Sequence, residues 1–162
     1  MNTKILLILA IIIASPLLTI AQSISFFGHH LSNISEFSND NLNNLGFYSN
    51  DDGFYYGGLW GYDTRLYISY NSNKSSIDEL IFTIPFRETE YIDMSNANNL
   101  LASFTEKISK QLNTSKVAYN VPTVGCLFGN IVYCDDGYIL LYHDYSSLSR
   151  KGPIVLRYKL MQ

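Results

Sequence analysis

The fold class is decided by one stretch, LLASFTEKISKQL, which runs from Leu100 to Leu112. Apolar side chains recur there at every fourth position (Leu100, Phe104, Ile108 and Leu112), and Leu101 widens the stripe. This spacing places the apolar residues on one side of an α-helix and leaves the other side to water. We therefore predict an amphipathic helix that packs by one face against the rest of the domain.

Strand patterns lie on both sides of this helix. Residues 65–70 and 154–160 alternate between apolar and polar side chains, a period of two that is typical of antiparallel strands with one covered face. A shorter apolar stripe ends at Gly46-Phe47, where a glycine suited to the left-handed conformation can close a first helix. The prediction is an α+β fold with two helices packed on a mainly antiparallel sheet, in the order β-α-β(3-4)-α-β(3-4).

The same order can also be read as two tandem helix-plus-meander units. Gly58-Leu59-Trp60-Gly61 in the first half is echoed by Cys126-Leu127-Phe128-Gly129 in the second, and alternating strands follow both segments. An echo of four residues can also arise by chance. The internal duplication is therefore an alternative within the α+β prediction.

The two cysteines, Cys126 and Cys134, are candidates for a disulfide. If the chain turns around Gly129-Asn130-Ile131, the two residues face one another across a hairpin, close enough for a bridge. A two-residue Gly129-Asn130 turn would instead put them on opposite faces and forbid the bond. Their spacing matches neither a zinc pair nor a redox pair. We favour the hairpin with the disulfide.

Residues 1–21 have the layout of a cleavable signal peptide. Lys4 precedes an apolar run, and small residues precede a cut that would make Gln22 the new terminus. The alternative is a membrane anchor, but the run is interrupted by Ser15-Pro16 before it reaches the roughly 20 apolar residues of a span. We expect a single domain over residues 22–162, periplasmic or secreted, with no membrane span after signal cleavage.

Charge and composition narrow the class of partner. The formal net charge is −3 with only 11 basic residues, which argues against nucleic acid as a partner. The 13 tyrosines add amphipathic area without charge, which suits a contact surface. The simpler interpretation is that many of them pave a β-sheet.

No set of catalytic or metal-binding residues stands out. His29 and His30 are adjacent, so their rings should point in different directions, and the parity of His143 places it with buried strand residues. The pairs Asp51-Asp52 and Asp135-Asp136 precede glycines, where aspartate favours a turn. We predict no enzyme activity, no metal and no cofactor. A weak calcium site at either turn and a small hydrolase built from His143, His30 and aspartates are the alternatives.

The most unusual stretch is FYYGGLWGY, residues 54–62. Glycines permit close approach of another molecule, and aromatic faces supply contact area. We therefore predict a binding surface that is formed by Tyr55, Tyr56, Trp60 and Tyr62. The alternative is that Trp60 anchors the core at a bulged hairpin.

Several short motifs support a resemblance that spans most of residues 22–162. They are Phe26-Phe27-Gly28, Leu45-Gly46-Phe47, Tyr56-Gly57-Gly58-Leu59-Trp60-Gly61, the helix at Leu100–Leu112, and Gly137-Tyr138-Ile139-Leu140-Leu141 with Ile154–Tyr158. With these motifs the chain resembles a diverged member of a group of small secreted α+β domains of Gram-negative bacteria that has no assigned function. The Tyr-Gly-Lys-Pro-like exit of that group from the second helix is replaced here by Asn113-Thr114-Ser115-Lys116.

A more distant resemblance concerns the layout alone. Helix-plus-meander units are similar to those of the β-lactamase-inhibitor protein and of small outer-membrane assembly lipoproteins, which act by protein contact. This resemblance implies a non-enzymatic interaction domain that binds an extracytoplasmic protein, as an inhibitor, immunity factor or envelope accessory. The alternative is a glycan-binding module that stacks sugars on exposed Tyr and Trp rings.

Overall fold

The computed structural model describes residues 34–73, 76–123, 126–135, 137–145 and 148–160. Its helices are the 3-10 turns η2 (Ile34–Phe37) and η3 (Glu88–Glu90) and the α-helices α2 (Asn39–Asn44) and α3 (Met94–Gln111). Its strands are β1 (Tyr48–Ser49), β2 (Tyr55–Leu59), β3 (Tyr62–Tyr70), β4 (Ile77–Ile84), β5 (Ile92–Asp93), β6 (Val117–Thr123), β7 (Cys126–Tyr133), β8 (Gly137–His143), β9 (Lys151–Gly152) and β10 (Ile154–Leu160). In these described segments no helix is both long and apolar enough to cross a membrane.

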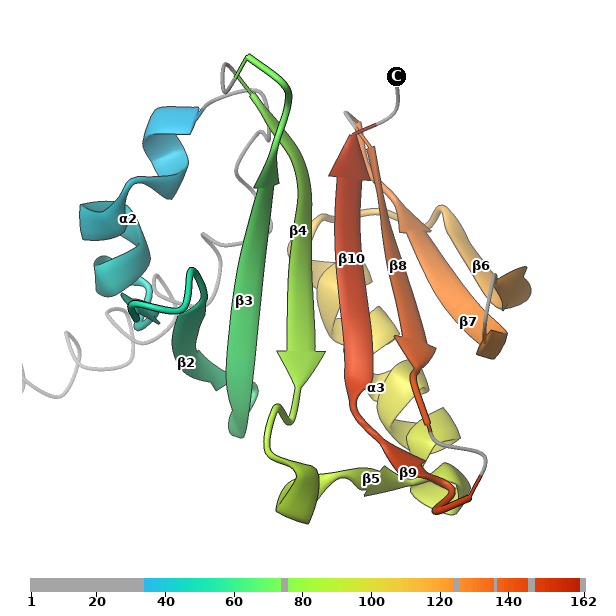
Figure 1. Cartoon of the computed structure of the whole chain (residues 1–162). Coiled ribbons are helices and arrows are strands. Elements are labelled where there is room, and N and C mark those ends of the chain that lie inside the picture. The colour runs from blue at the N-terminus through green and yellow to red at the C-terminus, as the bar shows by residue number, and fades with distance from the viewer. Residues whose placement is uncertain (1–33, 74–75, 124–125, 136, 146–147, 161–162) are drawn as a thin grey trace, which may run out of the picture.

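One antiparallel sheet of eight strands organises the fold (Figure 1). Its order is β1-β2-β3-β4-β10-β8-β7-β6, so each half is a helix followed by a meander whose last strand lies at the centre. This confirms the predicted α+β class with two helices on a mainly antiparallel sheet, and the topology repeats the helix-plus-meander unit. The four-residue echo does not follow the repeat, because Gly58–Gly61 covers the end of β2 and the turn to β3 whereas Cys126–Gly129 lies within β7.

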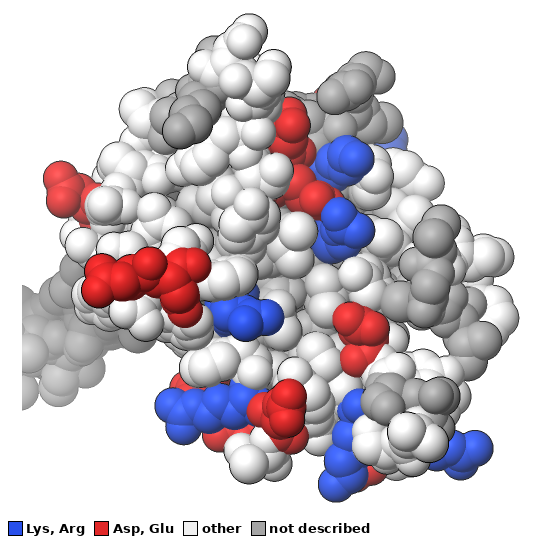
Figure 2. All heavy atoms as spheres, in the orientation of Figure 1, with Lys and Arg blue, Asp and Glu red and all other residues white. Residues whose placement is uncertain are grey.

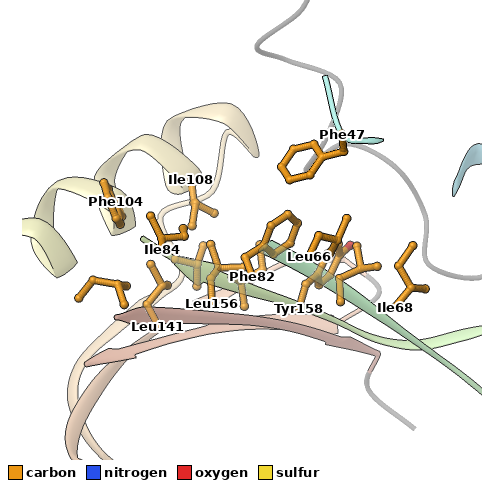
Figure 3. Close-up of a cluster of buried hydrophobic side chains, with 14 of the residues drawn as sticks. Phe47, Leu66, Ile68, Phe82, Ile84, Phe104, Ile108, Leu141, Leu156 and Tyr158 are labelled. Atoms are coloured by element: carbon orange, nitrogen blue, oxygen red, sulfur yellow. The ribbon is translucent and has the colours of Figure 1, made fainter. Parts of the chain in front are cut away.

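The core lies between the sheet and the helices (Figure 3). Alternate residues of the central strands point to this side, among them Phe82 of β4 and Leu156 of β10, and both are fully buried. Phe104 and Ile108 of α3 reach the sheet from above, and Phe47 covers it on the side of α2. Every second residue of the central strands and every third or fourth residue of α3 thus belong to a single apolar cluster.

The predicted end of the first helix is confirmed at α2. Gly46 has a φ of +82°, the left-handed conformation that glycine adopts without steric cost. The Phe47 N–H donates to the Leu42 carbonyl at 2.8 Å, and the Gly46 N–H donates to the Asn43 carbonyl at 2.9 Å. These two bonds define a Schellman cap, and the buried Leu42 and Phe47 side chains supply its apolar contact.

The predicted hairpin around Gly129-Asn130-Ile131 is wrong, because these residues lie inside the continuous strand β7. Gly129 serves close packing and not a turn, since a Cβ built there would lie 2.6 Å from the Leu141 carbonyl oxygen of β8. Asn130 is buried and its amide donates to Thr105 Oγ1 of α3 at 3.0 Å. Both residue types that looked like a turn signal therefore connect β7 to its neighbours.

The predicted disulfide between Cys126 and Cys134 is wrong for the same reason. Cys126 begins β7 and Cys134 directly follows its last residue, Tyr133. At roughly 3.3 Å per residue along a strand, their Cα atoms are about 25 Å apart. A disulfide needs a separation below about 7 Å. The two thiols of one chain cannot form a bridge in this fold.

The contact at Gly129 predicts a large effect of a single methyl group. We expect Gly129→Ala to lower the free energy of unfolding by about 1–3 kcal/mol, because β7 and β8 must separate to admit the Cβ. The control is Gly58→Ala in β2, where a Cβ would have no heavy atom within 4 Å. Its effect should stay within about 0.5 kcal/mol. Urea unfolding followed by Trp60 fluorescence measures both, and equal losses would contradict the account of β7.

Candidate functional site

The four aromatic residues predicted as a binding surface do not lie on one face. In the hairpin of β2 and β3, Tyr55 and Tyr62 point to the side of the helices, and together with Trp60 they pack against the buried core. Tyr56 points to the other side, opposite Arg65. The aromatic residues of FYYGGLWGY therefore divide between the core and the opposite surface of the sheet.

Trp60 anchors the end of the β2–β3 hairpin to α3. Trp60 and Gly61 form the turn, with φ values of 54° and 87°, and a non-glycine residue with such a φ is uncommon. Its ring centroid lies 4.5 Å from that of Phe104, and the Lys107 Nζ lies 5.6 Å from the indole ring. These contacts agree with the alternative that Trp60 anchors the core. Trp60 does so from a tight turn and not from a bulge.

The face of the sheet opposite α2 and α3, here named the helix-free face, is the side seen in Figure 1, where α3 lies behind β8 and β10. Figure 2 shows the same view, in which most of the surface is uncharged and the acidic and basic side chains gather in several small groups, some with both signs side by side. Aromatic side chains remain open there: Tyr67 is 43% and Tyr133 37% exposed. The strand alternation assigns to this face Tyr56, Arg65, Tyr67, Ser69, Glu79, Ile81, Thr83, Ile131, Tyr133, Tyr138, Leu140, Tyr142, Val155, Arg157 and Lys159.

A hollow of about 210 Å³ opens on the helix-free face. We name it the Arg65 hollow; it is lined by Phe54, Arg65, Tyr67, Ile81 and Thr83. The rings of Phe54 and Tyr67 form one wall, with centroids 5.6 Å apart, and the Arg65 guanidinium lies 4.7 Å above the Phe54 ring. The hollow therefore combines apolar walls, one cation and the hydroxyl-bearing side chains of Tyr67 and Thr83.

None of these five residues was among the predicted site residues. The signal that could have found them lies in the residues that alternate with the buried ones along each strand, which were expected only to face solvent. Arg65 and Tyr67 alternate with buried Leu66 and Ile68, and β4 places Ile81 opposite Tyr67. A meander predicts that these two consecutive strands pair, but it does not predict their register, so the juxtaposition of Tyr67 and Ile81 was not predictable.

Arg65 is the cation of the hollow and has no ion pair within the described segments. The nearest acidic influence is Asp52, whose carboxylate accepts a hydrogen bond from the Tyr56 hydroxyl at 2.5 Å. This bond is the main reason that the pKa of Asp52 is lowered, and the Arg65 charge adds a smaller effect. The same bond raises the pKa of Tyr56. Asp52 is thus committed to Tyr56 at the edge of the hollow.

At the centre of the helix-free face an ion pair joins the two halves of the sheet. Arg157 of β10 donates to both carboxylate oxygens of Glu79 in β4, through Nε and Nη2 at 2.7 Å each. The Glu79 bond raises the pKa of Arg157 despite partial burial. Arg157 is thus satisfied by a carboxylate, whereas Arg65 contacts the Phe54 ring and Tyr56 and makes no ion pair in the described part of the chain.

His143 is buried and its ring binds backbone. Its Nε2 lies 3.0 Å from the Ile92 carbonyl oxygen and 3.2 Å from that of Gly152. Both partners are acceptors, so Nε2 carries the proton and links β8 to the short strands β5 and β9. His30, the other histidine of the hydrolase alternative, lies outside the described residues. Throughout the segments that can be described, no three His, Cys, Asp or Glu side chains come together as a metal site.

The stacking of Trp60 predicts a structural role that can be measured. Trp60→Ala should lower the free energy of unfolding by about 2–3 kcal/mol, because it removes a ring packed on Phe104. Tyr67→Ala, which removes an exposed ring of the helix-free face, should cost less than about 1 kcal/mol. Urea unfolding followed by far-UV circular dichroism compares the two variants. An equal or larger loss for Tyr67→Ala would refute the assignment of Trp60 to the core.

The Asp52–Tyr56 bond predicts a pH dependence. A lowered pKa in the folded state means that the bond stabilises the protein above the ordinary aspartate pKa and that this contribution is lost as the pH falls through the folded value. In Tyr56→Phe the pKa of Asp52 should rise toward its ordinary value, because the hydroxyl donor is gone. Carboxyl-detected NMR titration of both proteins measures the shift, with Asp40 as the reference carboxyl. An unchanged Asp52 pKa would show that the bond is absent in solution.

Comparison with known proteins identifies no relative. The chain matches no protein-family model, no curated protein and no solved structure. The resemblance to the group of secreted bacterial domains therefore stays a prediction from the motifs. The candidate site stands on its own geometry, the Arg65 hollow on the helix-free face.

Proposed function

We propose that this chain is a non-enzymatic interaction domain that acts outside the cytoplasm and binds a protein partner through the helix-free face. Its role would be that of an inhibitor, an immunity factor or an envelope accessory. The observation that carries the proposal is the Arg65 hollow, in which a cation that makes no ion pair within the described segments lies over the Phe54 ring and beside apolar side chains.

The composition of this face is the main support. Tyrosine and arginine supply a large share of binding energy at protein interfaces, while charged residues are depleted from interface centres. On the helix-free face, open tyrosines such as Tyr67 and Tyr133 surround aliphatic side chains, among them Ile81 and Leu140. The central Glu79–Arg157 pair is satisfied internally, so covering it by a partner leaves no buried charge without a counter-charge.

The size of the hollow favours a protein over a small-molecule ligand. Pockets for cofactors and drug-sized ligands usually hold about 300–1,000 Å³. The Arg65 hollow has about 210 Å³, which suits one inserted side chain. A rigid sheet can present this hollow and the rings around it as one preorganised surface.

The glycan-binding alternative has weaker support. It required Tyr55, Trp60 and Tyr62 to offer open ring faces to sugars, whereas these three rings pack against the core. Tyr56 and the tyrosines outside that stretch would have to carry the stacking. We therefore keep glycan binding as an outcome of the test.

Site-specific photo-crosslinking tests the proposal. A photoreactive phenylalanine analogue replaces Tyr67 on the helix-free face or, as the matched control, Lys110 on the exposed side of α3. With the envelope and secreted fractions of the source cells, the position of Tyr67 should capture one defined protein, and the position of Lys110 should not. Mass spectrometry identifies the captured protein.

Two results would overturn the proposal. Equal capture from both positions would mean that the helix-free face is not the interface. Binding to polysaccharides on a glycan array, with loss in Tyr67→Ala and without any protein capture, would replace protein binding by the glycan alternative.

A further inference from the structure

We propose that the Arg65 hollow receives a glutamate side chain of the partner protein, with the glutamate carboxylate on the Arg65 guanidinium and its methylene groups against the apolar lining formed by the rings of Phe54 and Tyr67 and by Ile81. This inference rests on the proposed function and specifies the chemistry of the partner. It is carried by the charge of Arg65 and by the size and apolar lining of the hollow.

The charge argument begins with what surrounds Arg65. The carbon of its guanidinium lies 4.7 Å from the Phe54 ring centroid, a cation–π contact, and Arg65 also acts on Tyr56 through its charge and a side-chain hydrogen bond. Two parallel N–H groups match the two oxygens of a carboxylate. The other arginine in the middle of this face, Arg157, makes that bidentate contact with Glu79 of the same chain. Arg65 has no such carboxylate within the segments that the structure describes.

The shape argument concerns the rest of the ligand. Besides the cation, the lining includes Phe54, Tyr67 and Ile81, whose apolar surfaces suit methylene groups and not a second charge. The Thr83 hydroxyl adds one further polar group to the lining. A volume of about 210 Å³ accommodates one side chain with an apolar stem and a charged end. Glutamate has this form, and an inorganic anion would leave the apolar walls without contact.

Asp52 supplies an internal check on the electrostatics. Its carboxylate interacts with the Arg65 charge and is held at the edge of the hollow by Tyr56. A second carboxylate entering the hollow is therefore repelled by Asp52 while it is attracted by Arg65. Removing the Asp52 charge should strengthen binding, whereas removing the Arg65 charge should weaken it.

NMR titration of the isotope-labelled protein with defined peptides tests the inference. The probes are acetyl-Ala-Glu-Ala-amide, its isosteric counterpart acetyl-Ala-Gln-Ala-amide, and acetyl-Ala-Ala with a free terminal carboxylate. We expect millimolar binding of the glutamate peptide, with shifts at Arg65, Tyr67 and Thr83, and binding weaker by about tenfold for the glutamine peptide.

Variants of the protein test the roles of the two charges. Arg65→Gln should weaken binding of the glutamate peptide by a similar factor, and Asp52→Asn should strengthen this binding about twofold. Arg65→Lys, which keeps the charge and loses the fork, should fall between the wild type and Arg65→Gln.

Several outcomes would overturn the inference. Equal binding of the glutamate and glutamine peptides, shifts remote from the hollow, or weaker binding in Asp52→Asn would each exclude a carboxylate bound by Arg65. Preference for the free terminal carboxylate would assign the hollow to a chain end and not to glutamate. A thermal melt of each variant verifies folding before titration. If the peptides fail to bind while crosslinking through Tyr67 still captures a protein, this inference is lost and the proposed function stands. If the glutamate peptide binds at the hollow while the position of Tyr67 captures no protein, the proposed function is lost and the carboxylate site stands.

Discussion

The pairing of β4 with β10 is the constraint on which the remaining structure depends. These two strands end the two meanders, and their antiparallel register sets Phe82 opposite Leu156 and Ile84 opposite Ile154. All four side chains are fully buried beneath the helices. A shift of this register by one residue would turn every one of them to the other face. The pairing therefore fixes both halves of the sheet relative to one another and makes a single core from two helix-plus-meander units.

The same register determines the helix-free face. Because successive side chains alternate, the residues between the buried ones are brought together on the opposite side, and Glu79 of β4 reaches Arg157 of β10 there. Glu79 lies opposite Lys159 and diagonally to Arg157, and a shift of one strand by one residue would turn one partner of the ion pair to the other face. The apolar side chains buried on one side of the sheet and the ion pair on the other side thus favour the same alignment of β4 and β10.

The sequence predicted the parts of the fold that have local causes. The four-residue stripe of α3, the Gly46-Phe47 cap of α2 and the alternation in β10 each depend on neighbours along the chain, and each is confirmed. The prediction failed at Gly129-Asn130, where the same residue types that favour turns are used for a close approach to Leu141 and a buried bond to Thr105. Those partners come from β8 and α3, so nothing within a few residues of Gly129 could indicate them.

The candidate site was less predictable than the fold, because its residues come from two strands and a turn. FYYGGLWGY contains only Phe54 of the hollow, and three of the four predicted binding residues pack against the core. Composition identified an aromatic stretch, but only the pairing of β3 with β4 brings Tyr67 next to Ile81. The residues that line the hollow are therefore determined by the register of β3 against β4.

The hollow also depends on the covered side of the sheet. A Cβ at Gly57 would collide with the Gly46 carbonyl oxygen and the Phe47 ring, so this glycine allows the cap of α2 to rest directly on β2. Phe54 and Tyr56 flank the start of the same strand, and Tyr56 pairs with Arg65 across to β3. The position of β2, and with it the wall formed by Phe54, is therefore set by a helix cap on the opposite face. Since the ring and the cation are held by backbone pairing and by packing, the site is organised before any partner arrives, which reduces the conformational entropy lost on binding.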